Sequence, residues 1–497
     1  MTPKWATRFR SLAPFQAGWF EMPRDSADLV RVFGPESKGD TEEARAASSH
    51  KVFVRSQIQI TEDDNRGTGR KMTALEALRS YGWDVLARVA DEGCVPLVSE
   101  PDEPASTLKA RRAALNLTPQ QLARGAGVTP AIVEKAEVVG NVCSIRDLEK
   151  IAQALALNEH LLGFTSGAGG DMRLGVRLRE MTQANDAQHF SATDVLNLTE
   201  AAWVVFTQSE LLRLLNEHGP LATRDRFAPD PDYRYPTFER GYLLAENARK
   251  LLRISDSEPI RSVKQLVEET LGIPVIQEQL AERFAGATIA NGSDRGIVIN
   301  ERGQNSNVWV RRMTIAHELG HLLWDPDSSL NRLKVDRYDD LQADYVPERM
   351  PAGAPKDPVE IRTNAFAISF LAPRQGVRAI ASKNDDNTKL VSEVMETYGV
   401  SATATKHHIR NVTGRDVAAV HIRDLPGPSD ESIAAENMAV DWFPLGSTPI
   451  SRRGRFSFFV VKAFRAGLIS GDTAAIYLRS TEEEFRRHQS KVVNAFV

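Results

Sequence analysis

Two histidines four residues apart carry the clearest chemistry in this 497-residue sequence. His317 and His321 lie in the run WVRRMTIAHELGHLLW, residues 309–324, which lacks proline and has apolar residues at helical spacing. This run predicts a buried helix. A spacing of four puts both imidazoles on one helix face, where they can bind one metal ion at about 2.0–2.1 Å. Glu318 is displaced around the helix axis, where its carboxylate can reach a metal-bound water.

Chance alone is a poor explanation for this motif. With 10 histidines in the chain, an H-E-x-x-H run arises by chance in roughly one such sequence per hundred. Two buried histidines that merely packed in a core would also need separate hydrogen-bond partners. We therefore interpret the motif as a hydrolytic zinc site with Glu318 as general base. Such a site needs a third protein ligand besides His317 and His321.

A second helix is predicted downstream, in PVEIRTNAFAISFLAP at residues 358–373. The pairing of H-E-L-G-H-L-L with a later E-x-x-x-N-x-F-A…L-x-P resembles the ImmA/IrrE family of metallopeptidases, over roughly residues 243–375. In that family the glutamate four residues before the asparagine is the third zinc ligand, which implies Glu360 here. Without the resemblance, Glu360 could be an ordinary exposed helix residue. The sequence departs from the family at Arg362, where members often carry a second acidic residue, but that position is not the ligand.

The resemblance implies an endopeptidase with one zinc ion per chain and a protein substrate, such as a repressor-type regulator. A transcriptional regulator that uses the peptidase fold as a sensor is the main alternative. A third reading, an antitoxin-like protein with a vestigial site, is disfavoured by the intact set of four residues. The strand at 296–300 is a candidate edge for binding an extended substrate, or else an ordinary sheet strand.

A helix-turn-helix is expected in the first half of the chain. The motifs LNLTPQQLA, GVT and LEKIAQAL within residues 108–162 resemble the XRE/lambda-repressor-like family. Residues 109–150 hold seven basic and four acidic residues, a modest surplus for phosphate contact. The third helix, beginning at Thr129, offers almost no side chains that read bases. Glu134 would repel phosphates if it lies on the docking face. DNA binding through 108–163 and protein docking both stay open. We expect residues 1–168 to bind DNA weakly and without sequence preference.

Composition sets the broad class of the protein. Sixty-two basic and 66 acidic residues give a net charge of −4, so no global feature points to nucleic acid or an anionic membrane. No run of about 18 apolar residues predicts a membrane span. The N-terminal residues lack the apolar core of a signal peptide, and Cys94 and Cys143 form no C-x-x-C pattern. We expect a cytoplasmic protein without a membrane partner; the oligomeric state stays open.

The chain is predicted to be α+β, mostly helical and multidomain, with a helix-turn-helix module and a zincin-like metallopeptidase domain that holds a small sheet. The predicted segments are an N-terminal domain at 1–105, the helix-turn-helix at 106–165, a hinge and helical linker at 166–242, the metallopeptidase at 243–375, a helical extension at 376–425 and a small module at 426–497. Local predictions are a strand at 51–60, a helix at 73–89 capped by Thr73, a flexible hinge at 165–170, a helix at 262–275 ending at Gly272, a hairpin at 287–300, and His407 and His408 on the surface.

Overall fold

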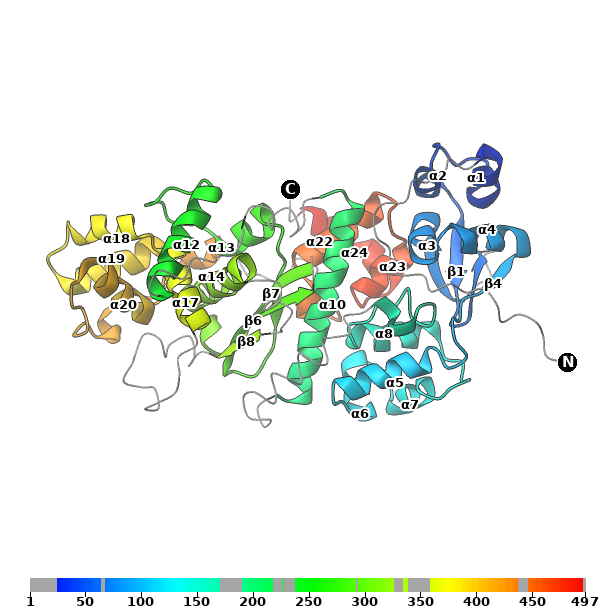
Figure 1. Cartoon of the computed structure of the whole chain (residues 1–497), viewed down its shortest axis with the longest axis horizontal. Coiled ribbons are helices and arrows are strands. Elements are labelled where there is room, and N and C mark those ends of the chain that lie inside the picture. The colour runs from blue at the N-terminus through cyan, green and yellow to red at the C-terminus, as the bar shows by residue number, and fades with distance from the viewer. Residues whose placement is uncertain are drawn as a thin grey trace.

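The computed structural model confirms a mostly helical α+β chain, and the residues that it describes form two four-stranded sheets (Figure 1). Among the described residues, no helix combines the length and apolar character needed to cross a membrane. The predicted segment boundaries stay predictions. The structure describes residues 25–63, 68–169, 190–217, 227, 237–291, 294–325, 334–337, 358–436 and 446–494, with the backbone alone at 168–169 and 334–337.

The sheet nearest the H-E-x-x-H motif has the order β5-β7-β6-β8, with β5 parallel to β7 and the other pairs antiparallel. The predicted hairpin is confirmed, with longer strands than expected. Of the two alternatives for 296–300, the ordinary sheet strand is confirmed and the docking edge is wrong, because Val298 of β7 pairs with Ile276 on one side and Ala287 on the other. The near-continuous apolar run of β7 is typical of a strand covered on both faces. The strands are β5 (Val275–Glu278), β6 (Phe284–Asn291), β7 (Asp294–Asn300) and β8 (Lys334–Arg337).

Three helices pack together beside this sheet (Figure 1). α14 (Val308–Trp324) carries the histidine pair and packs on β6 and β7. Its N-cap is Asn307, whose side chain accepts from the backbone N–H of Trp309. α17 (Pro358–Leu371) and α12 (Thr237–Leu251) pack against each other, and α17 also packs on α14. Because α14 and α17 are apolar around most of their circumference, both are buried.

Beyond α17 the chain forms α18 (Arg374–Ala381), α19 (Asn387–Tyr398) and α20 (Ala402–Thr413) at one end of the molecule (Figure 1). The prediction that His408 lies on the surface is wrong, because its side chain is buried. Its Nδ1 lies 3.0 Å from the Tyr242 hydroxyl, and its Nε2 lies 2.7 Å from the carbonyl oxygen of Ala372. Helical periodicity explains the error, since His408 falls on the same apolar stripe as Ala404 and Val412.

The other end of the molecule holds the second sheet, of order β3-β1-β2-β4 (Figure 1). The single strand predicted at 51–60 is in fact two antiparallel strands, joined by a turn at 56–58 through which the alternation of residue types continues. The helix predicted at 73–89 is divided at Gly82, whose φ of +82° favours glycine. Its Thr73 cap is confirmed and forms a capping box with Glu76. The elements are α1 (Ser26–Phe33), α2 (Glu42–Ser48), β1 (Val52–Arg55), β2 (Gln59–Glu62), β3 (Arg70–Thr73), α3 (Ala74–Tyr81), α4 (Trp83–Glu92) and β4 (Cys94–Pro96).

The segment that resembles a helix-turn-helix consists of short helices. Thr118 forms a capping box with Gln121 at the start of the second helix, and Gly127 ends that helix at a φ of +66°. In the predicted hinge, residues 166–169 form the 3₁₀ helix η1, while Gly170 lies outside the described residues. The helices are α5 (Ala105–Ala114), α6 (Pro119–Ala126), α7 (Pro130–Ala136) and α8 (Ile145–Ala154).

The long helix α10 (Ala192–Leu214) stands between the β5–β8 sheet and the C-terminal helices (Figure 1). It shares one hydrophobic core with α6, α8, one face of that sheet and the C-terminal helices. The helix predicted at 262–275 is shorter and consists of α13 (Val263–Gln265) and the π-helix η2 (Leu266–Thr270), with Gly272 in the left-handed region after it. The remaining elements are α21 (Asp430–Glu436), the 3₁₀ helices η3 (Gly303–Ser306), η5 (Ile422–Asp424) and η6 (Ile450–Arg452), and α22 (Arg455–Arg465), α23 (Gly471–Tyr477) and α24 (Glu482–Asn494).

Candidate metal centre

The two histidines of α14 converge as their spacing predicts. The Nε2 atoms of His317 and His321 lie 3.1 Å apart, and their ring centroids lie 4.8 Å apart. Both side chains are 1% exposed. Two basic nitrogens this close, buried against the same point, form one half of a metal-binding site.

Glu360 in the first turn of α17 completes the group. Its Oε2 lies 3.3 Å from His317 Nε2, and its Oε1 lies 3.7 Å from His321 Nε2. Two donors that each lie about 2.0–2.1 Å from one zinc ion can be at most about 4.2 Å apart, so these separations fit a shared ion. Within the described part of the chain, this is the one group of three or more His, Cys, Asp or Glu side chains whose ligand atoms gather in this way.

The second nitrogen of each imidazole faces an oxygen acceptor. His317 Nδ1 lies 2.9 Å from Asn364 Oδ1, and His321 Nδ1 lies 2.9 Å from Asp325 Oδ2. Since a carbonyl or carboxylate oxygen can only accept, each Nδ1 donates its proton. The Nε2 lone pairs are therefore directed at the shared point, which is the tautomer a metal-binding histidine requires.

Asp325 follows α14 directly and was not identified from the sequence. Burial favours its protonated form, but the hydrogen bond from His321 and the charges of His321 and Arg362 together lower the pKa of Asp325 to about 2. Arg362 donates from Nη2 to Asp325 Oδ1. The spacing in the sequence could have identified Asp325, because it stands four residues after His321 and so follows it on the same helix face.

Glu318 lies on a different side of α14 and turns toward β6. Its carboxylate is fully buried, and the hydroxyl of Thr288 donates to Oε2 over 2.6 Å. Gly286, two residues earlier on β6, allows this approach. A Cβ there would meet the Val298 carbonyl oxygen at 2.7 Å and Glu318 Oε1 at 3.1 Å. Sequence analysis missed Thr288, because strand-on-helix packing alone brings it to Glu318.

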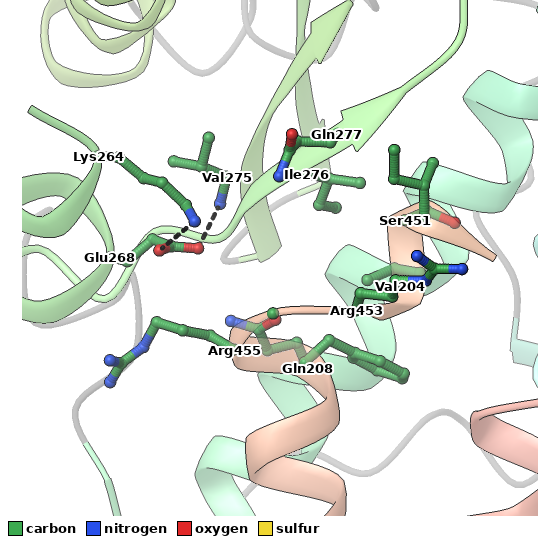
Figure 2. Close-up of a pocket in the computed structure, with 13 residues that line it drawn as sticks. Val204, Gln208, Lys264, Glu268, Val275, Ile276, Gln277, Ser451, Arg453 and Arg455 are labelled. Atoms are coloured by element: carbon green, nitrogen blue, oxygen red, sulfur yellow. Dashed lines mark hydrogen bonds and ion pairs between the residues drawn. The ribbon is translucent and has the colours of Figure 1, made fainter. Parts of the chain in front are cut away.

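A separate small pocket lies where the C-terminal segment meets the edge of the sheet. In Figure 2, Lys264, Glu268 and Val275 lie on one side of it, and Arg453 and Arg455 lie on the other. Lys264 Nζ lies 3.8 Å from Glu268 Oε2. No residue of the metal centre lines this pocket. The segment 450–456 therefore covers the β5 edge of the sheet at a distance from the candidate chemistry.

The helix-turn-helix-like segment presents a mixed surface around α7. Glu134 and Lys135 are exposed on this helix, and Val138 and Val139 are exposed just after it. Arg112 makes a bidentate pair with Glu137 at 2.6 and 2.7 Å, which offsets one of the cations counted toward phosphate contact. DNA binding by this segment stays a prediction.

One family model, described as Peptidase_M78, IrrE N-terminal-like domain, matches residues 268–410. The match runs from η2 through β5–β7, α14 and α17 and ends within α20, so it contains the whole metal centre. It supports a metallopeptidase-like domain, and the family implies a metal, typically zinc. The match covers less than a third of the chain and does not reach the helix-turn-helix-like segment. No curated protein matches the sequence.

Proposed function

We propose that this chain is a zinc-dependent endopeptidase that cleaves a protein substrate. His317, His321 and Glu360 hold the metal, and Glu318 is the general base. One observation carries the proposal: three side chains from two helices direct their ligand atoms at one point, and Glu318 follows His317 directly in α14. The match to a peptidase family over residues 268–410 supports the same reaction class.

Each residue has a distinct task in this proposal. When bound, zinc supplies a water of lowered pKa and polarises the substrate carbonyl. Glu318 takes the proton from the attacking water and passes it to the leaving amine. Thr288 holds the Glu318 carboxylate in place through its hydroxyl. Asn364 fixes the ring of His317 through Nδ1.

The substrate class comes from the resemblance to the ImmA/IrrE family, which implies a repressor-type protein. A regulator with a peptidase-like sensor is the alternative. The two are distinguished by catalysis, because a sensor needs no base at Glu318, whereas a peptidase does.

The proposal is tested first by metal content. Full-length protein reconstituted with zinc should hold one zinc ion per chain by elemental analysis, and His321→Ala and Glu360→Ala should not. His50→Ala is the matched control, since His50 is an exposed histidine outside the centre. Wild-type protein that binds no transition metal after reconstitution would refute the proposal.

The second test is cleavage. Incubation with purified candidate repressors should give defined fragments, a chelator should stop the cleavage, and added zinc should restore it. Cleavage that a chelator leaves unchanged would contradict a metal-dependent reaction.

A further inference from the structure

One buried ion pair ties together the two helices that supply the metal centre. Asp325 follows the last turn of α14, and Arg362 lies in the early part of α17, two residues after Glu360. Their side chains are 9% and 10% exposed. A charged pair this deeply buried is retained only where its hydrogen bonds are well made, since desolvation of each charge is costly.

The two oxygens of Asp325 serve different partners. Oδ2 accepts from His321 Nδ1 over 2.9 Å, and Oδ1 accepts from the guanidinium of Arg362. The carboxylate thus bridges a metal-facing imidazole on α14 to an arginine on α17. A carboxylate in this position fixes the ring orientation of a metal-binding histidine and makes its other nitrogen a stronger ligand.

The backbone alone does not explain the orientation of this carboxylate. The N–H of Asp325 donates to the carbonyl of His321 over 3.0 Å, which ends the helix but leaves the side chain its own rotation. Arg362 supplies the second contact that selects one rotamer. The guanidinium also lies 3.3 Å from the Thr363 hydroxyl.

We propose that Arg362 is a positioning residue for zinc: it holds Asp325 against His321 and thereby raises the affinity of the site for the metal. This inference rests on the proposed function, because it takes His321 to be a ligand. It gives the departure from the family at position 362 a physical meaning. An acidic residue here would place two carboxylates side by side, so an arginine at 362 and an aspartate at 325 belong together.

The test is zinc affinity of the full-length chain, measured by competition with a chromophoric chelator. Asp325→Asn and Arg362→Gln should each weaken zinc binding about 10- to 100-fold, as loss of an outer partner usually does. Arg362→Glu should weaken it more than Arg362→Gln, because it adds repulsion with Asp325. The double variant should bind no more weakly than Asp325→Asn alone, since both changes break one chain of contacts.

Two further variants serve as a matched control and as a charge-conserving comparison. Arg374→Gln is the matched control, because Arg374 on α18 pairs with Glu239 and Glu246 away from the centre, and it should bind zinc as wild type does. Arg362→Lys keeps the charge, so it should bind more tightly than Arg362→Gln and more weakly than wild type, and it serves if the glutamine variant folds poorly.

The outcomes separate the two levels of the proposal. Wild-type protein that binds no zinc overturns the proposed function itself. Wild-type protein that binds zinc while Arg362→Gln binds it equally well overturns only the positioning role. Strictly additive losses in the double variant would also overturn that role. Nitrogen NMR of His321 gives a readout that is independent of affinity: Nδ1 should carry the proton in wild type and lose this preference in Asp325→Asn.

Discussion

The metal centre and the junction around Glu200 are both buried and highly polar, yet they are organised in opposite ways. At the junction, Arg452 donates to both Glu200 oxygens, to Gln153 Oε1 at 3.0 Å and to the Tyr477 carbonyl at 3.0 Å. Arg479 adds a second cation, 3.0 Å from Glu200 Oε2. Glu200 thus lies between two cations, and each of these two arginines contacts its carboxylate. At the metal centre, by contrast, three electron-pair donors face one another.

This difference shows which kind of buried polarity marks a functional site. Opposite charges in contact are a structural solution to burial, since each satisfies the other. Donors of the same kind that converge require a cation between them. We expect the junction around Glu200 to act on stability and the metal centre to act on chemistry.

The largest effect is expected on catalysis when Glu318 is replaced. Glu318→Gln should lower kcat about 10²- to 10⁴-fold, because it removes the proposed proton acceptor of the reaction. It should retain zinc, because the three ligands are untouched. Peptide hydrolysis and metal content should be measured on the same preparation. If Glu318→Gln lost the metal while Glu360→Ala kept it, the assigned roles would be reversed.

The next largest effect is expected on stability, when the junction around Glu200 loses Arg452. Arg452→Met should lower the free energy of unfolding by about 3 kcal/mol, because the buried carboxylate of Glu200 loses its main partner. Urea denaturation followed by fluorescence measures the change. Arg487→Met, which breaks the exposed pair with Glu483, is the control and should cost less than about 1 kcal/mol. Zinc affinity should not change in either variant, and a loss of zinc in Arg452→Met would break the comparison.

Glu278 makes the stability of the junction depend on pH. Burial and the nearby charge of Glu200 raise the pKa of Glu278 to about 8. The folded carboxyl stays protonated up to that pH, whereas the unfolded one ionises near pH 4.5. Stability should therefore fall between pH 4.5 and 8, by at most about 1.4 kcal/mol per pH unit.

Glu278→Gln should remove this dependence and be more stable than wild type by about 3 kcal/mol at pH 7. The advantage should vanish near pH 4.5, and thermal unfolding midpoints across this range measure it. Glu200 has the opposite sign: burial raises its pKa, but Arg452 and Arg479 lower it to about 2, so its contribution is present above pH 4.5 and lost as the pH falls toward 2. An advantage of Glu278→Gln that stayed constant with pH would contradict the assignment.

A smaller effect is expected from the hydroxyl that holds the base. Thr288→Val keeps the side-chain shape but removes the donor to Glu318, so kcat/KM should fall about tenfold, a loss of about 1.4 kcal/mol of transition-state stabilisation. Zinc content should be unchanged. Thr405→Val is the control, because that buried hydroxyl donates to the carbonyl of Ser401, the N-cap of its own helix. Equal activities of the two variants would show that Thr288 does not act through Glu318.

The smallest effect is expected in DNA selectivity. The full chain should bind duplex DNA with micromolar or weaker affinity and discriminate sequences less than about tenfold, because Arg112 is paired with Glu137 and Glu134 is exposed on α7. Fluorescence anisotropy with the upstream region of its own gene and a shuffled duplex measures this. Nanomolar, competitor-resistant binding would make regulation the primary function.

Sequence patterns predict those parts of the metal centre that depend on local helix geometry. A spacing of four fixes His317 and His321 on one face of any helix, so their convergence could be predicted. Glu360 could be named only through the family resemblance, because nothing in its own helix points to a metal. Thr288 could not be found, since its contact with Glu318 arises from the packing of β6 on α14.

The errors have similar physical causes. Alternation of residue types identifies a strand but not its place in a sheet, so β7 was taken for a candidate edge. The same alternation continued across a turn and hid the break between β1 and β2. His408 was predicted to lie on the surface, although its place on the apolar stripe of α20 indicates burial.

The cover on the β5 edge has a consequence for synthesis on the ribosome. The strands β5–β7 leave the ribosome about 150 residues before the segment 450–456 that packs against them. At 5–20 residues per second, this delay is roughly 8–30 s. During that time the nascent chain presents an open strand edge, the kind of surface that pairs with other chains. Ribosome-bound fragments that stop before residue 446 should therefore recruit chaperones more strongly than the full-length chain.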